Sequence, residues 1–374
     1  GKQIETSNSF CFTLFVAARG TGRREAACSR ARRRDASATR AVAQCGHRRV
    51  GACNSRRKTA VELTILCDFA SPELAEGVAR RCAGARLLTV GADGPPPARL
   101  PGPVLLTTGV GNPALPALLA AASELRWLHV FGTGVDTFPL HLVPPGVTMT
   151  CARGATAVPI AEWVLAMMLA FEKQLPQIWI SAPPARLWQA SLGTLDGRTL
   201  GLAGLGSIGA AVASRAAAFG MQVVALTRSP RADPPPGVQM VRTKEELCER
   251  ADHLVLCLPA TPATRHFIDG AALARMKPGS HLVNVARGAL VDQEALRAAL
   301  DAGRVAGAAL DVVEPEPLPA GHWLYAHPRV RLSPHISWSA PQTFAALRER
   351  FLDNLGRFAR GEPLRGVVDR EAGY

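Results

Sequence analysis

The sequence lacks any run of about 18 consecutive apolar residues, the length that a helix needs to cross a bilayer. It also lacks a C-x-x-C pair and an H-E-x-x-H motif, two spacings typical of zinc sites. These absences argue against a membrane-spanning protein, and we expect no metal. The cysteines after residue 60 lie mostly in apolar runs, as free buried thiols do in a reducing compartment: Cys67, Cys82, Cys151, Cys248 and Cys257.

Acidic residues are scarce in the first 60 residues, which hold 14 Lys and Arg against three acids. This segment carries a net charge of +11 and leaves +2 for the rest of the chain. It has no hydrophobic periodicity that would bury so many arginines, so we expect residues 1–60 to form a basic, disordered extension outside the fold. An arm that binds nucleic acid is not favoured, because no aromatic residues are interleaved with the arginines.

The origin of this extension has two interpretations of equal weight. Its Arg-, Ser- and Ala-rich composition resembles a mitochondrial or plastid transit peptide, and residues 10–18 resemble a short signal-peptide core. Because the chain begins without Met, the extension is alternatively upstream sequence translated from a mistaken start site. We expect a cytoplasmic protein, or one in a plastid or mitochondrion if residues 1–60 are a transit peptide.

The remaining chain is long enough for two domains with substantial cores, since 374 residues with 48% hydrophobic content exceed what one small domain needs. From residue 62 onward, short apolar runs alternate with helical patterns. Such near-continuous apolar strands predict a parallel sheet covered on both faces. Strands are expected at 62–68, 85–90, 103–108 and 126–132, with helices at 71–83, where Ser71 is a candidate N-cap, and 113–125.

A long helix at 157–175 precedes a loop-like stretch that we take as a domain boundary. A second alternating series follows and ends in a helix at 340–361 that could fold back onto the first domain. Its expected strands are 199–204, 222–227, 253–259, 281–286 and 307–312, with helices at 207–220, 243–251 and 292–303, and Thr243 and Glu246 spaced as a capping box. The histidines outside the motifs below are interpreted as surface or loop residues: His253, His266, His322 and His327.

A glycine motif lies between the first strand and helix of this second series. "GLGSIG" places Gly204, Gly206 and Gly209 in a G-x-G-x-x-G pattern. The first glycine allows a tight turn, the second lets a pyrophosphate approach the backbone, and the third permits close packing of helix on strand. The helix N-terminus then faces the phosphates, so the context predicts a dinucleotide site rather than an ordinary turn.

The second strand of this series ends in hydroxyl and guanidinium groups, where NAD-binding proteins have an acid for the ribose 2′-hydroxyl. The residues present are Thr227, Arg228, Ser229 and Arg231. Arginines beside hydroxyls accommodate a 2′-phosphate. We therefore predict NADP as the preferred cofactor, with NAD possible.

Three polar residues follow strands of the same predicted sheet: Arg287 in "NVARGALVD", Glu316 in "DVVEPEP" and His335 in "RLSPHISW". Ligands of open α/β sheets bind at the carboxyl edge, so these side chains are expected in one crevice. Hydride transfer to a keto carbon develops an alkoxide, which needs a cation and a proton donor. Imidazole beside a carboxylate stays protonated near neutrality, and Arg is always charged.

The ordered motifs "GLAGLGSIG", "CLPATPATRHFID", "NVARGALVD", "ALDVVEPEPLP" and "SPHIS" resemble the D-isomer-specific 2-hydroxyacid dehydrogenase family, in its glyoxylate/hydroxypyruvate reductase and phosphoglycerate dehydrogenase branches. The resemblance runs from about residue 62 to the end. It implies an α/β protein of two doubly wound parallel-sheet domains, with a Rossmann NAD(P)-binding domain inserted into a flavodoxin-like substrate domain. The expected boundaries are 61–157 with 338–374 for the substrate domain and 158–337 for the dinucleotide domain, joined by helix 157–175.

The resemblance also implies a role for each matching residue. Arg287 holds the substrate carboxylate and polarises the 2-keto oxygen, His335 is the acid and base, and Glu316 orients it. Cofactor contacts are expected from Gly204, Gly206, Ser207, Ile208, Gly209, Thr227, Arg228, Ser229, Pro259, Thr264, Ala286 and Asp311. Substrate contacts are expected from Thr108, Gly109, Val110, Gly134 and Trp338, and the assembly is expected to be a homodimer.

One departure from the family bears on the substrate. Phosphoglycerate dehydrogenases often have an Arg-Ser pair where this chain has Thr107 and Thr108. Without that cation, a small 2-keto acid such as glyoxylate or hydroxypyruvate is favoured over a phosphorylated one. A phosphoglycerate dehydrogenase-like enzyme and a dinucleotide-sensing corepressor on the same fold remain alternatives; formate dehydrogenase ranks low, because its family has Gln at the position of Glu316.

Overall fold

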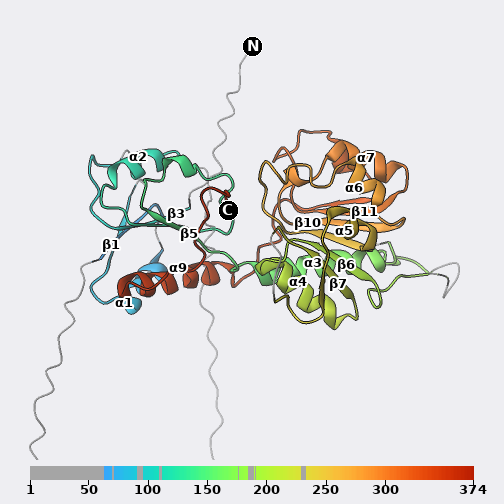
Figure 1. Cartoon of the computed structure of the whole chain (residues 1–374), viewed down its shortest axis with the longest axis horizontal. Coiled ribbons are helices and arrows are strands. Elements are labelled where there is room, and N and C mark those ends of the chain that lie inside the picture. Colours follow the sequence, from blue (N-terminus) through green and yellow to red (C-terminus); the bar gives the residue numbers. More distant parts are fainter. Residues whose placement is uncertain are drawn as a thin grey trace, which may run out of the picture. The chain divides into compact units, whose positions relative to one another are not determined.

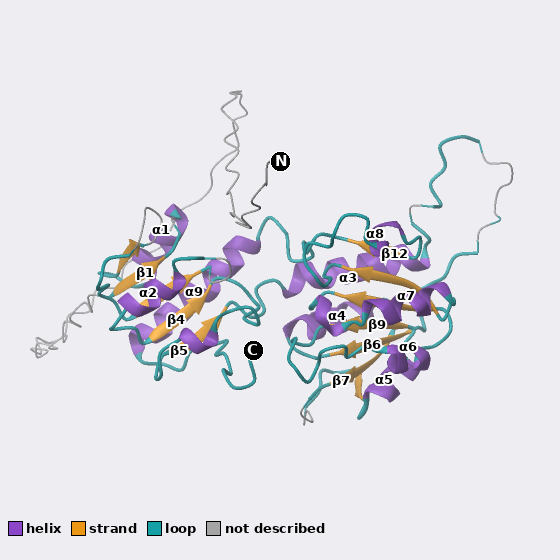
Figure 2. Cartoon of the chain, turned by 90° about the horizontal axis from the view of Figure 1, so that it is seen from above, coloured by secondary structure: helices purple, strands orange, loops and turns teal. Residues whose placement is uncertain are grey.

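The computed structural model describes residues 63–69, 71–90, 96–108, 112–175, 177–183, 189, 191–228 and 233–374. The expected basic extension, residues 1–60, lies outside this described part. The described residues from Leu63 onward form two sheets, each made of parallel strands and each covered by helices on both faces (Figures 1 and 2).

The first sheet has five strands in the order β2-β1-β3-β4-β5, all parallel. This is the flavodoxin-like strand order expected for the substrate domain. Its central strands are largely apolar and fully buried, which requires cover on both faces. The strands are β1 (Thr64–Cys67), β2 (Arg86–Thr89), β3 (Val104–Thr107), β4 (Trp127–Val130) and β5 (Thr148–Cys151).

Helices cover the two faces of the first sheet: α1 (Pro72–Arg81) and α9 (Thr343–Arg360) lie together on one face, and α2 (Leu115–Ala121) lies on the other (Figure 1). Ser71 caps α1 by accepting a hydrogen bond from the Leu74 N–H at 3.2 Å, as expected. The ring of Phe351 in α9 stacks on Trp127 of β4 at 5.3 Å. The C-terminal helix therefore folds back onto the first sheet, which confirms that expectation.

The second sheet has seven parallel strands in the order β12-β11-β10-β9-β6-β7-β8, a Rossmann order with β6 at the point of reversal. Two buried clusters of apolar residues pack on its opposite faces. The strands are β6 (Thr199–Ala203), β7 (Gln222–Leu226), β8 (Val238–Met240), β9 (His253–Leu256), β10 (Ser280–Asn284), β11 (Val305–Leu310) and β12 (Val330–Leu332). The helices are α3 (Ala157–Glu172), α4 (Ser207–Ala218), α5 (Lys244–Arg250), α6 (Gly270–Arg275), α7 (Gln293–Asp301) and α8 (Trp323–Ala326), with a short 3-10 turn η2 (Gly288–Leu290). The 3-10 turn η1 (Leu140–Leu142) belongs to the first sheet, between β4 and β5.

Some elements were not predicted. Strand β5 alternates threonine with apolar residues, and β8 is a three-residue edge strand; neither has the apolar run used to recognise the others. The long helix α3 ends at Glu172, three residues before the predicted end. Within the described ranges, no helix combines the length and apolarity needed to cross a membrane.

The interpretation of His253 as a surface or loop residue is wrong. His253 begins β9 in the middle of the second sheet and is fully buried. Its Nε2 lies 3.0 Å from the Glu172 carboxylate at the end of α3, and its Nδ1 lies 3.3 Å from Nδ1 of His281. A buried carboxylate partner satisfies the imidazole, so this polar residue is tolerated in the core.

Candidate active site

The glycine loop joins β6 to α4. Gly204 has φ of +101°, and a Cβ there would lie 2.7 Å from the Cys257 carbonyl oxygen, so only glycine fits. A Cβ on Gly209 would collide with the Gly204 carbonyl. At Gly206, by contrast, no described atom lies within 4 Å of the position that a Cβ would take, so the backbone is open to a ligand. The three glycines thus meet the three requirements of a dinucleotide loop.

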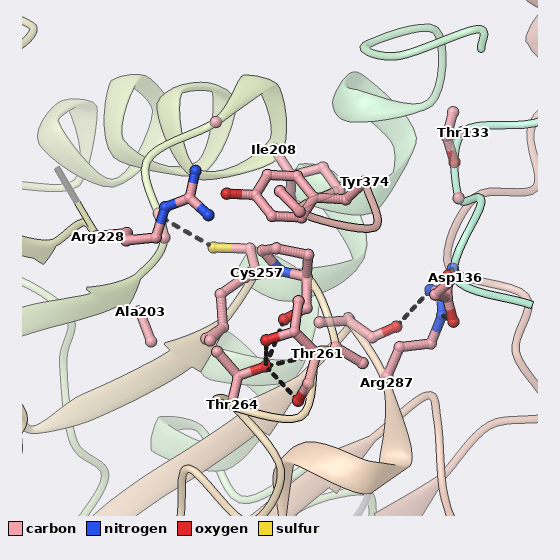
Figure 3. A pocket seen from close by; sticks show the side chains of 18 of the residues that line it. Thr133, Asp136, Ala203, Ile208, Arg228, Cys257, Thr261, Thr264, Arg287 and Tyr374 are labelled. Atoms are coloured by element: carbon pink, nitrogen blue, oxygen red, sulfur yellow. Dashed lines mark hydrogen bonds and ion pairs between the residues drawn. The ribbon is translucent and has the colours of Figure 1, made fainter. Parts of the chain in front are cut away.

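A second wall of the site is the loop after β9, which is held in a compact turn by Thr264. Its hydroxyl donates to the Pro259 carbonyl at 2.8 Å and accepts from the Thr261 N–H at 2.8 Å (Figure 3). Because the hydroxyl is used inside the turn, Thr264 shapes the loop as well as lining the cavity.

Arg287 lies just beyond β10, on a turn that Asn284 fixes. The fully buried Asn284 side chain donates to the Arg287 carbonyl at 2.8 Å and accepts from the Ala286 N–H at 3.0 Å. The guanidinium reaches Asp136, in the loop after β4, through two hydrogen bonds of 2.8 and 2.6 Å (Figure 3). The arginine is therefore held in a planar fork with one carboxylate.

The electrostatics of this pair favour the ionised form. Burial alone would raise the pKa of Asp136, but the hydrogen bond and charge of Arg287 outweigh it and hold that pKa below its usual value. The positive charge of His335 adds to the same shift, so these groups share one electrostatic environment. Asp136 is then a fixed anion beside the arginine.

His335 and Glu316 form the expected pair. Nδ1 of His335 lies 3.0 Å from Oε2 of Glu316, while Oε1 of Glu316 accepts from the Val313 N–H at 3.0 Å. Burial tends to raise the pKa of Glu316, but the hydrogen bond from His335 and the one from the Val313 N–H keep it below the ordinary value. The carboxylate therefore remains charged and fixes the orientation of the ring through Nδ1.

The loop that carries His335 is organised by Asp311 at the end of β11. The Asp311 carboxylate accepts from the N–H groups of Ile336 and Ser337, each at 2.9 Å, and its carbonyl accepts from the His335 N–H. His335 has φ of +54°, a left-handed conformation that these bonds maintain. Trp338 donates its indole N–H to the His335 carbonyl at 2.8 Å. Cofactor contact by Asp311 and substrate contact by Trp338 stay predictions.

A cavity of about 1010 Å³ connects the glycine loop with Arg287. It is at the upper end of the size range of small-molecule sites, as a dinucleotide requires. The predicted residues that line it are Gly134, Gly204, Gly206, Ser207, Ile208, Thr227, Arg228, Pro259, Thr264, Ala286 and Arg287. Those described but outside its lining are Thr108, Gly209, Asp311, Glu316, His335 and Trp338.

The first-sheet loop expected to bind substrate is only partly described. The Thr108 N–H donates to Oδ1 of Asp68 at 3.0 Å, and Asn112 donates to Oδ2 of the same carboxylate at 2.6 Å. Gly109, Val110, Ser229 and Arg231 lie outside the described residues. Their roles, and that of Thr108, stay predictions.

Several cavity residues were missed from the sequence. Asp136 lies just beyond the strand predicted at 126–132, where ligands of parallel sheets bind, so its carboxylate was an overlooked signal. Arg153 adds a third cation to the lining beside Arg228 and Arg287, and Glu371, Ala372 and Tyr374 enter from the C-terminal tail. No local pattern indicates these residues, because tertiary folding brings them to the cavity.

Comparisons with known proteins agree with this geometry. The sequence model of the D-isomer specific 2-hydroxyacid dehydrogenase NAD binding domain matches residues 165–337. The chain is 34% identical to a glyoxylate reductase of Korarchaeum cryptofilum over 261 residues, covering 67% of this chain and 78% of that protein. It is 33% identical to a D-3-phosphoglycerate dehydrogenase of Methanocaldococcus jannaschii over 263 residues, which is 67% of this chain and 49% of the relative.

Among solved structures, the chain resembles an NADPH-dependent glyoxylate/hydroxypyruvate reductase of Sinorhizobium meliloti in complex with NADP and sulfate, with a TM-score of 0.69 and 26% identity over 83% of this chain and 100% of that one. The chain belongs to the D-isomer specific 2-hydroxyacid dehydrogenase family. The chain spans about half the length of the phosphoglycerate dehydrogenases it matches, 49% and 48% for two of them.

Proposed function

We propose that this chain is an NADP-preferring reductase of small 2-keto acids, acting on glyoxylate or hydroxypyruvate. The observation that carries the proposal is that Arg287 lines the same cavity as the glycine loop Gly204–Gly206. A carboxylate-binding cation and a dinucleotide loop in one cavity suit hydride transfer to a keto acid. Glyoxylate reductases among the relatives support the substrate class.

The residues present fit the nicotinamide cofactor. The open backbone at Gly206 and the N-terminus of α4 suit a pyrophosphate, and Arg228 suits a 2′-phosphate at the far end. When bound, the cofactor supplies the hydride for reduction of the keto carbon. Asp311 and Ala286 are proposed to complete its contacts near the reacting centre.

The chain's own residues supply the rest of the reaction. Arg287 binds the substrate carboxylate and stabilises the negative charge that develops on the keto oxygen. His335 donates its Nε2 proton to that oxygen, and Glu316 stabilises the imidazolium before transfer. Thr108, Gly109, Val110, Gly134 and Trp338 are proposed to enclose the substrate.

The remaining organisation is also a proposal. We infer a substrate domain of residues 61–157 with 338–374, a dinucleotide domain of residues 158–337, and a homodimer. Strands β1–β5 and β6–β12 support the division, because each set forms its own sheet.

A phosphoglycerate dehydrogenase-like activity is the second candidate, and the observation in its favour is Arg153. This exposed cation lines the cavity and could bind a substrate phosphate in place of the arginine that family members carry near Thr107. Preferential reduction of phosphohydroxypyruvate, weakened by Arg153→Ala, would favour this candidate.

The test is steady-state reduction of glyoxylate, hydroxypyruvate, pyruvate and phosphohydroxypyruvate with NADPH and with NADH. The proposal expects turnover of an unphosphorylated keto acid, a higher kcat/KM for NADPH, and loss of that preference in Arg228→Ala. Tight dinucleotide binding without turnover of any keto acid, accompanied by dinucleotide-dependent oligomerisation, would instead favour the corepressor alternative.

A further inference from the structure

The aromatic ring of Tyr374 lies beside the guanidinium of Arg228 within the cavity wall (Figure 3). The Arg228 Cζ atom is 5.1 Å from the centroid of the ring, within the range of a cation–π contact. Arg228 follows the carboxyl end of β7 in the second sheet, whereas Tyr374 comes from the C-terminal tail. Two distant parts of the chain thus meet at the end of the cavity where a dinucleotide's adenosine would bind.

The tail that carries Tyr374 is attached to the first sheet. Thr150 of β5 forms an antiparallel bridge with Val367, and the Val368 N–H donates to the Met149 carbonyl at 2.9 Å. Arg370 then donates to three carbonyls of the loop beyond β4, those of Leu140, Val143 and Pro144, at 3.3, 2.6 and 3.2 Å. These bonds tie the start of the tail to the substrate-domain sheet.

The last residues close a turn instead of trailing away. The N–H of Asp369 donates to the Tyr374 carbonyl at 2.9 Å, and the N–H of Tyr374 donates back to the Asp369 carbonyl at 3.2 Å. Asp369 also accepts from the N–H groups of Glu371 and Ala372. The ring is therefore presented on a hydrogen-bonded turn, which lowers the entropic cost of holding it against Arg228.

We propose that Tyr374 is a positioning residue that holds Arg228 ready for the 2′-phosphate of the cofactor and so sets the preference for NADP. The inference rests on the proposed function. Among the described residues, no carboxylate lies within ion-pair distance of Arg228, so the ring restrains the guanidinium without neutralising it. A carboxylate in the place of the ring would compete with the phosphate, whereas an aromatic face leaves the donor edge of the guanidinium free.

The structure also suggests the opposite hypothesis, in which the ring merely blocks the cavity and must leave before a dinucleotide enters. The two hypotheses predict opposite changes in nucleotide affinity when the ring is removed. A positioning role makes loss of the ring weaken binding of ligands with a 2′-phosphate. A blocking role makes loss of the ring strengthen binding of every nucleotide.

The test is calorimetric titration of the full chain with 2′,5′-ADP and with 5′-AMP, which contain the adenosine end of NADP and NAD and undergo no turnover. Tyr374→Ala is expected to weaken binding of 2′,5′-ADP by about threefold to tenfold and to leave 5′-AMP within about twofold. Tyr374→Phe retains the aromatic face and should bind both as the unaltered chain does. In an Arg228→Ala background, Tyr374→Ala should have no further effect, because its partner is gone.

Two further variants separate local from general effects. Tyr325→Ala removes the other tyrosine of the sequence, which is 58% exposed on α8, and should change neither affinity. Arg370→Ala loosens the tail and should reproduce part of the Tyr374→Ala effect. The inference is overturned if Tyr374→Ala changes both affinities equally, strengthens either, or leaves both unchanged, or if the unaltered chain binds 2′,5′-ADP no better than 5′-AMP.

These outcomes are independent of the keto acid reaction. Discrimination that depends on Tyr374 in a chain that reduces no keto acid would overturn the reductase proposal and support the positioning role. Reduction of keto acids by a chain whose nucleotide affinities do not depend on Tyr374 would support the reductase proposal and overturn the positioning role.

Discussion

Arg287 and Asp136 form a forked ion pair that joins the end of β10 in the second sheet to the loop after β4 in the first. The two side chains are 33% and 19% exposed, so the pair is largely shielded from water. Asp136 fixes the plane of the guanidinium and offsets part of its charge. In the proposed function, the arginine is thereby oriented before the substrate arrives, which lowers the cost of binding a carboxylate.

Replacing the guanidinium of Arg287 with an ammonium group should lower the catalytic efficiency. In Arg287→Lys the ammonium cannot contact Asp136 and a substrate carboxylate in one plane, so kcat/KM for the keto acid should fall by about a hundredfold or more. Steady-state kinetics with saturating NADPH measure this change.

The chain offers a matched control in Arg265, which forms a similar fork with Glu314 at 3.0 and 2.9 Å. This pair is more exposed, 54% and 42%, and lies outside the cavity lining. Arg265→Lys should leave kcat/KM within about twofold of the unaltered enzyme, since exposed pairs contribute little. Equal losses in both variants would show that Arg287 has no special place in the reaction.

The Glu316–His335 pair predicts a change in the pH profile. The pKa of Glu316 is held below its ordinary value by its contacts with His335 and Val313, so Glu316 is an anion wherever the enzyme works. Glu316→Gln removes the negative charge that favours the protonated imidazole. The alkaline limb of the kcat/KM profile for reduction should therefore move to lower pH, and the profile for oxidation of the 2-hydroxy acid should gain activity on its acidic side. An alkaline limb that stays in place would contradict this role.

Two glycines of the same loop should respond differently to a methyl group. Gly206→Ala should fold with a free energy of unfolding within about 0.5 kcal/mol of the unaltered chain, because no described atom lies near the new Cβ. Its dinucleotide affinity should nevertheless fall, since the methyl group stands where the pyrophosphate approaches. Denaturant unfolding and nucleotide titration measure the two effects separately.

Gly204→Ala provides the contrast. Its Cβ would lie 2.7 Å from a backbone oxygen and its φ is +101°, so stability itself should fall by about 1–3 kcal/mol. If Gly206→Ala bound NADPH as tightly as the unaltered chain, the assignment of this loop to the pyrophosphate would be wrong.

Buried His129 makes stability depend on pH. Burial lowers the pKa of His129 from its ordinary 6.5 to about 3, and its Nε2 has no hydrogen-bond partner among the described residues. The unfolded chain binds the proton more readily below pH 6.5, so the folded state loses free energy as the pH falls from 6.5 toward 3. At pH 5 this single group should cost about 2 kcal/mol relative to pH 8.

His129→Phe removes the titrating group, so its free energy of unfolding should change less between pH 8 and pH 5 than that of the unaltered chain. Its stability at pH 8 reports the separate cost of losing the contact with Thr150. His141→Phe alters an exposed histidine and should retain the full pH dependence. Parallel stability curves for the unaltered chain and His129→Phe would contradict the assignment.

The elements that could be predicted from the sequence are those specified by the residues within them. Strands such as Val104–Thr107 are continuous apolar runs, and the caps at Ser71 and Thr243 are local hydrogen bonds between residues three apart. The glycine loop was recognised for the same reason, because its tight turn and close packing require glycine whatever the rest of the chain does. Strand β5 was not predicted because Thr148 and Thr150 interrupt its apolar pattern.

The site was predictable in part. Arg287, Glu316 and His335 each follow a strand of one sheet, so strand order alone brings them to one edge. Asp136 and Tyr374 reach Arg287 and Arg228 from the other sheet and from the tail, contacts that depend on how distant segments pack. The prediction for His253 was wrong because its partner Glu172 is 81 residues away, and a buried hydrogen-bonded pair has no local signature.

The most direct test of the account is the consumption of NADPH by the full chain and by His335→Gln in the presence of glyoxylate, with nucleotide binding followed in parallel. We expect rapid oxidation of NADPH that requires the keto acid, a loss of at least about a hundredfold in the variant, and unchanged NADPH affinity, since His335 lies outside the cavity lining. Turnover that survives in His335→Gln would contradict the assignment of the proton donor. An unaltered chain that binds NADPH but fails to oxidise it with any keto acid would contradict the proposed function itself.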